Sequence, residues 1–289
     1  MWCGSVPEFN IFLSRFNKSL ENILEKGIIV DNLNIHIKVE CCVCIADAPE
    51  RALLLNMNKF NGKFGCIMCM QPGENLNKSK RGNNHKFLYH AEQMKVRTES
   101  RYIQQVSEAI SKNICFEGIK GATHLSKWLH LPTSIIIDYM HASLLGTTKH
   151  MLNIWLSASN CKKEFYLGRK ITDIDEILLQ VKYPIEFPRE QRSLAQHLNY
   201  FKASEYRNFI FYTGIAVLIH ALPLDYYVHF VEYVIFIRLL CNTKIRNEHI
   251  LIAFNIIDKY VQTFQKYYGE KNMTFNLHSH LHLPQQVKR

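Results

Sequence analysis

Residues 58–72 read NKFNGKFGCIMCMQP, and this glycine-rich stretch, the cysteine turn, carries the most specific local signal in the 289-residue chain. At its centre, Cys66-Ile67-Met68-Cys69 forms a C-x-x-C pair directly after a glycine. Two thiolates at this spacing on a turn can both ligate one tetrahedral Zn2+ ion. Because one pair supplies only half of a four-ligand site, two further ligands are needed.

The C-terminal segment 274–284, TFNLHSHLHLP, offers those ligands. On a helix, His278 and His282 lie four residues apart on one face and can reach the same ion, whereas on a strand His280 would share their face as well. We therefore predict a closed, structural zinc site that ties the end of the chain to its beginning. Its four ligands are Cys66, Cys69, His278 and His282.

Two alternatives remain open for these cysteines. The upstream sequence CCVC at residues 41–44 is a rival source of thiol ligands, although cysteines within a strand more often belong to the core. A redox role for the C-x-x-C pair is disfavoured, because residues 66–69 do not open a helix after a strand as thioredoxin-like motifs do.

Before the cysteine turn, the sequence predicts a strand. Residues 34–41 alternate apolar and polar side chains, and the run CCVCIA at 41–46 predicts a continuing buried strand that ends at Asp47. An acid fixed at the end of a buried strand is well placed for chemistry. The alternative is that Asp47 caps the next helix, predicted at residues 50–57.

The rest of the chain is mostly helical in pattern. An amphipathic helix is predicted to start near Ser5 and Pro7 and to stop at Gly27, and residues 75–90 form a polar, exposed loop. Asp138 is expected to cap a helix. Further helices are predicted at residues 99–112, 138–158, 173–180, 204–221, 225–241 and 247–268.

Charge and composition restrict the function classes. The formal net charge of +10 favours a polyanionic partner such as DNA. The chain contains no apolar run of about 18 residues and no signal-peptide pattern, so we expect no membrane span and free or metal-bound thiols. The weak import-like string KSKR at 78–81 is consistent with a nuclear location. Candidate DNA-binding residues, which are alternatively a solvated loop, are Lys78, Lys80, Arg81 and Lys86.

Taken in order, several phrases resemble CACTA-type (En/Spm-like) DNA transposases, within the wider group that includes the recombinase of antigen-receptor assembly. They cover the chain from about Trp2 to Val287. The matching phrases are CIADAPERALLL, FNGKFGCIMCM, KGATHL, IIIDYMHASLLGTTKHML, FPREQRSL, FKASEYRNFIFY, LDYYVHFVEYVIFIRLL and YYGEKNMTFNLHSHLHLPQQV.

The resemblance implies an RNase H-like (retroviral-integrase-like) core followed by a large, mostly helical insertion. Three carboxylates of such a core bind two Mg2+ or Mn2+ ions for phosphoryl transfer on DNA. Asp47 falls on the second of these acids, and the four predicted zinc ligands fall on the zinc ligands of the group, although the two histidines stand one residue closer than in the antigen-receptor recombinase. The implied domains are a partial core with the cysteine turn at 1–72, a basic loop at 73–98 and the helical insertion at 99–289.

The same resemblance predicts that the chain is catalytically incomplete. The first Asp of the group falls before Met1, and the final Glu falls beyond Arg289. The chain is therefore expected to be transposase-derived and inactive by itself, and to act in homo-oligomers. The alternative is a domesticated, zinc-stabilised module that binds DNA or another protein without catalysis.

Overall fold

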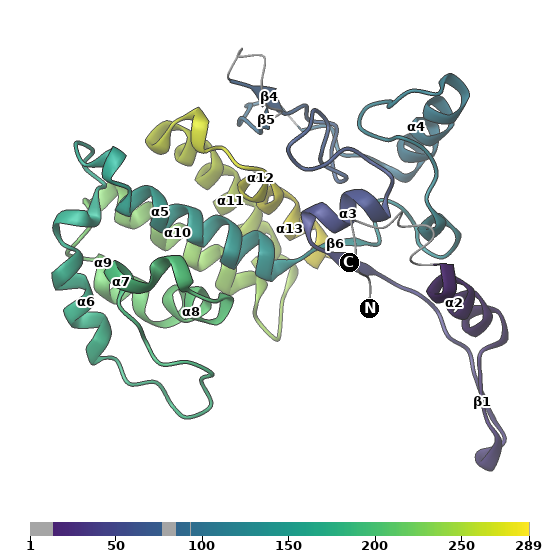
Figure 1. The fold of residues 1–289 in the computed structure, drawn as a ribbon, viewed down its shortest axis with the longest axis horizontal. Coiled ribbons are helices and arrows are strands. Elements are labelled where there is room, and N and C mark those ends of the chain that lie inside the picture. Colours follow the sequence, from purple (N-terminus) through teal and green to yellow (C-terminus); the bar gives the residue numbers. More distant parts are fainter. Residues whose placement is uncertain (1–13, 77–84, 93, 289) are drawn as a thin grey trace, which may run out of the picture. The chain divides into compact units, whose positions relative to one another are not determined.

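The computed structural model of the chain describes residues 14–76, 85–92 and 94–288. The protein is mixed α/β, with several long helices and only short strands (Figure 1). It divides into two compact units: the first comprises Met1–Pro72 and Met94–Ile136, and the second comprises Gly73–Gln93 and Ile137–Arg289. The cysteine turn belongs to the first unit, and the C-terminal histidines belong to the second.

The first unit is built from short elements. They are α2 (Ser14–Lys26), β1 (Ile28–Val30), β2 (Ile35–Ile37), β3 (Cys44–Ala46), α3 (Ala48–Leu54), α4 (Glu99–Lys112) and β6 (Ile135–Ile137), which ends at the unit boundary. Strands β1 and β2 form an antiparallel pair in which Ile28 faces Ile37. Strand β3 pairs with β6, and the amide of Cys44 donates to the carbonyl of Ser134 at 2.9 Å.

The sequence predicts one continuous strand through residues 34–46, but the structure contains two separate strands there. Residues 38–43 have no regular secondary structure. The expectation of a buried strand at 41–46 is wrong, because β3 has only one neighbouring strand. Val43 and Ile45 consequently remain 50% and 63% exposed, and Ala46 is the one buried residue of β3.

Helix α2 confirms the C-terminal end of the first predicted helix. Gly27 follows it with φ 68°, a left-handed conformation that glycine adopts without a steric penalty, and its amide donates to the carbonyl of Ile23 at 2.8 Å. The predicted helix start at Ser5 and Pro7 lies outside the described residues.

The sheets are too small to test the expected RNase H-like core. Within the described ranges the strands form three separate two-stranded sheets and no larger one. The α/β character of the chain is confirmed, whereas the RNase H-like arrangement stays a prediction.

The second unit is a helical assembly with one small hairpin. Its elements are β4 (Glu74–Asn75), β5 (His85–Lys86), α5 (Lys149–Leu156), α6 (Ile171–Gln180), α7 (Leu194–His197), α8 (Ala203–Asn208), α9 (Gly214–Leu218), α10 (Leu224–Leu240), α11 (Asn247–Tyr268), α12 (Phe275–Ser279) and α13 (Leu283–Val287).

Helices α10 and α11 pack against each other at the centre of this unit (Figure 1). Aromatic residues fill their interface, and the rings of Tyr233 and Tyr260 stack with centroids 5.2 Å apart. Phe230 and Phe264 are completely buried in the same core. Burial of such large rings stabilises a helix pair by roughly 1.5–3 kcal/mol per side chain. None of the described helices combines the length and apolar character needed to cross a bilayer.

The predicted helices at 99–112 and 247–268 match α4 and α11 residue for residue. The predicted helix at 138–158 instead consists of a π-helical segment, Met140–Thr148, followed by α5. The predicted helix at 204–221 is likewise interrupted, by a π-helical segment between α8 and α9. Hydrophobic spacing indicates the buried face of a helix, but it does not reveal where a wider turn is inserted.

Asp138 caps the helical segment that follows it, as predicted. Its carboxylate accepts hydrogen bonds from the amide of Met140 at 2.8 Å and from the ring Nδ1 of His141 at 2.6 Å. Burial raises the pKa of Asp138, but the hydrogen bonds from His141 outweigh this effect and hold the pKa below its usual value. The side chain is therefore satisfied by its own helix start.

A buried ion pair holds the start of α8. The carboxylate of Glu205 accepts from Nε and Nη2 of Arg192 at 2.6 and 2.7 Å and from the amide of Lys202 at 2.8 Å. Burial raises the pKa of Glu205, but the hydrogen bonds from Arg192 and Lys202 outweigh burial, so the pKa lies below its usual value. Glu205 is thus a structural carboxylate of the helical unit.

We expect Glu205→Gln to lower the free energy of unfolding by about 3 kcal/mol at pH 7, the low end for breaking a buried pair, because Arg192 is one-third exposed. Since the folded-state pKa is lowered, the stabilisation exists above the unfolded pKa of about 4.3 and disappears as pH falls through the folded pKa. Urea unfolding at pH 7, 5 and 3.5 measures this difference. The exposed Glu176→Gln variant is the control, with an expected change within about 0.5 kcal/mol; a Glu205→Gln effect independent of pH would contradict the prediction.

Candidate metal centre

The cysteine turn is fixed by backbone pairing with residues 95–97. The amide of Met70 donates to the carbonyl of Lys95 at 3.0 Å, and the amide of Arg97 donates to the carbonyl of Met68 at 2.9 Å. These two bonds flank Cys69, which forms an antiparallel bridge with Val96. Cys66 and Cys69 are both buried. Backbone hydrogen bonds to residues 95–97 therefore hold one edge of the turn that carries the two thiols.

Two glycines permit the close backbone approaches around this turn. A Cβ atom at Gly65 would collide with the carbonyl oxygen of Lys59. A Cβ atom at Gly118, which has φ 90°, would collide with the carbonyl oxygen of Phe64. Glycine is the residue that fits both the approach and the positive φ. Within the cysteine turn, the glycine at position 65 therefore has a steric cause.

The side chain of Arg97 packs against the cysteine turn, with 1% of its surface exposed. Its Nε donates to the carbonyl of Ile67 at 3.1 Å, and its Nη2 donates to the carbonyls of Cys66 and Cys69 at 3.1 and 3.2 Å. Burial lowers the pKa of Arg97, but an arginine side chain starts so far above neutrality that it stays charged. A fixed positive charge therefore sits next to the cysteine pair.

The histidine pair is carried by the helical turns at the end of the second unit. Helix α12 is capped by Thr274, whose hydroxyl accepts from the amide of Leu277 at 3.3 Å. A 3-10 turn, His280–His282, continues the helix into α13. His278 and His282 are both buried, and their Nε2 atoms lie 3.3 Å apart. The helical spacing predicted for this pair is confirmed.

Phe87 packs on the ring of His278. The two rings are stacked with centroids 4.7 Å apart, and Phe87 also makes an edge contact with Phe275 at 5.4 Å. The amide of Phe87 donates to the carbonyl of Met273 at 3.2 Å. The sequence predicts an exposed loop here, and this is wrong for Phe87 and Leu88, which are buried.

His280 is not part of the histidine pair, because the helical turn points it into the core. Its Nδ1 lies 2.7 Å from the carbonyl of Asn276, and its Nε2 lies 3.0 Å from the hydroxyl of Ser143 and 3.2 Å from that of Tyr233. Burial lowers its pKa to about 4, so the ring is neutral at physiological pH. His278 and His282 are therefore the two candidate ligands in the HSHLH sequence.

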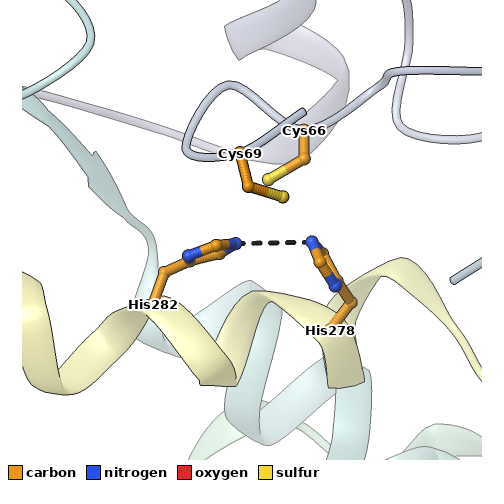
Figure 2. A group of neighbouring side chains, drawn as sticks. All are labelled: Cys66, Cys69, His278 and His282. Carbon is orange, nitrogen blue, oxygen red and sulfur yellow. Dashed lines mark hydrogen bonds between the residues drawn. The ribbon is translucent and has the colours of Figure 1, made fainter. Parts of the chain in front are cut away.

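One ligand atom from each of four buried side chains, Cys66, Cys69, His278 and His282, lies within 4.8 Å of the others (Figure 2). The edge of a tetrahedron is about 1.63 times its centre-to-corner distance. Two nitrogens bound to Zn2+ at about 2.0–2.1 Å are therefore about 3.3 Å apart, and two sulfurs bound at about 2.3 Å are about 3.8 Å apart. The measured 3.3 Å between the two Nε2 atoms matches a tetrahedral zinc site.

Without a cation, the surroundings of the cysteine pair disfavour ionisation of its thiols. Burial and the neighbouring Cys66 thiol raise the pKa of Cys69 well above its usual value, and the charge of Arg97 offsets only part of this rise. A bound divalent cation removes the penalty, because it stabilises the thiolate form directly. The residues present therefore fit a zinc ion in both geometry and chemistry.

Asp47 caps helix α3, as the second of the two interpretations of the sequence proposes. Its Oδ1 accepts from the amide of Glu50 at 2.9 Å, and the helix begins at Ala48 rather than at residue 50. Within the described ranges, one group of three or more Asp, Glu, His or Cys side chains could share an ion, and Asp47 is not in it. Its catalytic role stays a prediction.

The candidate DNA-binding residues are described only in part. Lys78, Lys80 and Arg81 lie outside the described residues. Lys86 is in β5 and is half-buried, and burial lowers its pKa. Arg97, which falls in the predicted basic loop at 73–98, is buried against the cysteine turn and is not a surface residue.

No protein-family model, no curated protein and no solved structure matches this chain. Function is therefore inferred from the side chains and their geometry. Arg97 and Phe87 are the supporting residues that the sequence did not reveal. Both lie in segments rich in polar and basic residues, and their burial is set by tertiary contacts that the local sequence does not specify.

We expect two substitutions of Asp47 to separate a cap from a catalytic acid. Asn caps a helix as well as Asp does, so Asp47→Asn should leave the free energy of unfolding unchanged within about 0.5 kcal/mol. Asp47→Ala removes the acceptor and should cost about 1 kcal/mol. Urea unfolding followed by circular dichroism measures both. Equal destabilisation by the two variants would show that the side chain does more than cap α3.

Proposed function

We propose that Cys66, Cys69, His278 and His282 bind one Zn2+ ion and that this ion is structural. The observation that carries the proposal is the gathering of four buried ligand atoms within 4.8 Å. Burial disfavours the charged thiolate form of a cysteine, and a bound cation restores it. A single cation satisfies all four at once.

The donor set favours zinc over other biological cations. Two thiolates and two imidazoles in a tetrahedron are the usual ligands of structural Zn2+, whereas Mg2+ and Ca2+ prefer oxygen ligands. Four protein ligands also complete the coordination sphere. No position is then left for a water or a substrate, so the ion supplies stability rather than catalysis.

An ion held by all four ligands would keep residues 66–69 next to residues 278–282, which are more than 200 positions away in the sequence. A structural site of this kind contributes its binding free energy to folding, because the ligands are not assembled in the unfolded chain. The proposed role of zinc is therefore to stabilise the native arrangement of these two segments.

We further propose that the chain derives from a CACTA-type DDE transposase. The ordered resemblance of its phrases supports this origin, and so does the gathering of the four side chains that the resemblance identifies as zinc ligands. An RNase H-like core, the second catalytic Asp at position 47 and a Mg2+ or Mn2+ site completed by other acids belong to the same proposal. Among the described residues Asp47 lies in no group of side chains that could share a metal ion, so we expect the chain by itself not to cut DNA.

The role that fits an inactive, zinc-stabilised chain is DNA binding in the nucleus, with homo-oligomerisation as in other transposases. The net charge of +10 supports a polyanionic partner. A protein-interaction module is the alternative, and a direct binding measurement distinguishes the two.

We expect the purified chain to contain one zinc ion per molecule, measured by mass spectrometry of the metal. Cys66→Ser and His282→Gln should lose the ion and unfold at a lower temperature, because removal of one ligand leaves three buried polar groups without full coordination. Chelation of zinc from the wild-type chain should have the same effect, and added zinc should reverse it.

The control for the zinc measurement is Cys161→Ser, which replaces an exposed cysteine and should keep both the ion and the melting temperature. A wild-type chain that is equally stable with and without zinc, or a Cys66→Ser variant with a full zinc content, would overturn the proposed site.

We expect the chain to bind duplex DNA without cutting it. The affinity should fall at least tenfold between about 50 and 200 mM salt, because phosphate contacts release counterions. Fluorescence anisotropy with a labelled duplex measures the binding, and a supercoiled plasmid with Mg2+ or Mn2+ tests nicking. No binding at about 50 mM salt would favour the protein-interaction alternative, and nicking that Asp47→Ala abolishes would contradict the inactive assignment.

A further inference from the structure

The buried guanidinium of Arg97 touches three successive parts of the cysteine turn. It donates to the carbonyl oxygens of Cys66, Ile67 and Cys69, and each distance is between 3.1 and 3.2 Å. Three carbonyl oxygens that converge on one point repel one another unless a donor lies between them. The planar fork of arginine supplies several donors at fixed angles.

We infer that Arg97 is the positioning residue of the cysteine pair, and that its fork sets how tightly the chain binds zinc. The inference rests on the proposed zinc site and deepens it. Arg97 acts on the backbone that carries the two thiols, so it fixes their separation before a metal arrives. Preorganised ligands bind more tightly because less conformational entropy is lost on binding.

The fork itself is held from the other side by helix α4 and the turn that follows it. Nη1 of Arg97 donates to the side chain of Gln105, and Nη2 donates to the carbonyl of Glu117 at 3.3 Å. Gln105 also donates to the carboxylate of Glu117, which accepts two hydrogen bonds from Arg101 at 2.8 and 2.9 Å. The guanidinium therefore has one fixed orientation.

The main chain of Arg97 strengthens the same link. Its amide donates to the carbonyl of Met68 at 2.9 Å, so backbone and side chain of one residue bind four consecutive residues of the cysteine turn. Main-chain pairing alone would leave the turn free to tilt about that edge. The side chain adds contacts away from the edge and removes this freedom.

Lysine is the informative replacement, because it keeps the charge but loses the fork. An ammonium is a compact point donor and cannot span three carbonyls along with Gln105. If charge alone were important, Arg97→Lys would behave as the wild type. If the fork is important, Arg97→Lys should lose affinity much as Arg97→Gln does.

The experiment is a competition for zinc between the full chain and a chromophoric chelator. We expect Arg97→Lys and Arg97→Gln to bind zinc about 10–100-fold more weakly than the wild type, as is typical when an outer-shell partner of a metal site is lost. The control is Arg169→Gln, which removes an exposed arginine of the second unit and no contact with the cysteine turn or with the residues that hold Arg97, and it should stay within about threefold of the wild type.

A spectrum separates positioning from general stability. With saturating Co2+ in place of zinc, the thiolate-to-metal charge-transfer band reports the geometry of the two sulfurs. We expect this band to change in Arg97→Lys and to coincide in the wild type and Arg169→Gln. Circular dichroism at saturating metal verifies that each variant is folded.

The outcomes are distinct. Wild-type affinity and an unchanged cobalt spectrum in Arg97→Lys would overturn the inference while leaving the zinc site intact, whereas failure of the wild type to bind zinc would overturn the proposed function itself. If Arg97→Lys does not fold at saturating zinc, the same measurement is made on Gln105→Ala, which removes the hydrogen bond between the Arg97 guanidinium and α4. A loss of about threefold or more in that variant supports the inference, and an unchanged affinity overturns it.

Discussion

The candidate metal centre brings four buried ligand groups into one place, away from water. Two thiols and two imidazoles are buried with their ligand atoms within 4.8 Å, and burial already raises the pKa of the Cys69 thiol. Burial makes the charged thiolate form of such a group costly, and a bound cation would offset that cost. The chemistry of the group and its geometry both fit a tetrahedral divalent ion with affinity for sulfur.

Each ligand pair is supported within its own unit by residues that carry no ligand atom. Arg97 holds the backbone of the cysteine turn, whereas Phe87 stacks on the ring of His278. His280, which lies between the two histidine ligands, bonds to Ser143 and anchors the helical turn in the core. Metal sites generally depend on such outer partners, because a ligand free to rotate loses entropy on binding.

The sequence predicts those features that depend on local spacing. The C-x-x-C pair, the i, i+4 histidines and the helices α4 and α11 all follow from patterns within a few turns of chain. The supporting residues were missed because their role is set by tertiary contacts: Arg97 stands in a basic stretch and Phe87 in a polar one, yet both are buried. The strand at 41–46 was overestimated for the same reason, since burial of a strand depends on neighbours that its own sequence does not specify.

Asp47 and Cys66, two of the five residues that the transposase resemblance singles out, have different surroundings in the structure. A two-metal site needs several carboxylates around the ions, because each hard cation takes oxygen ligands from more than one acid. Asp47 instead has one carboxylate oxygen occupied by the start of α3, and among the described residues it belongs to no cluster of metal-binding side chains. Cys66, by contrast, lies among three further ligands at distances that a single ion can satisfy. A capped helix start needs no metal, whereas the two thiols and two imidazoles are arranged as a metal ion would require. The physical argument for a bound ion therefore applies to the zinc centre, and Asp47 acquires a catalytic meaning only where other acids surround it.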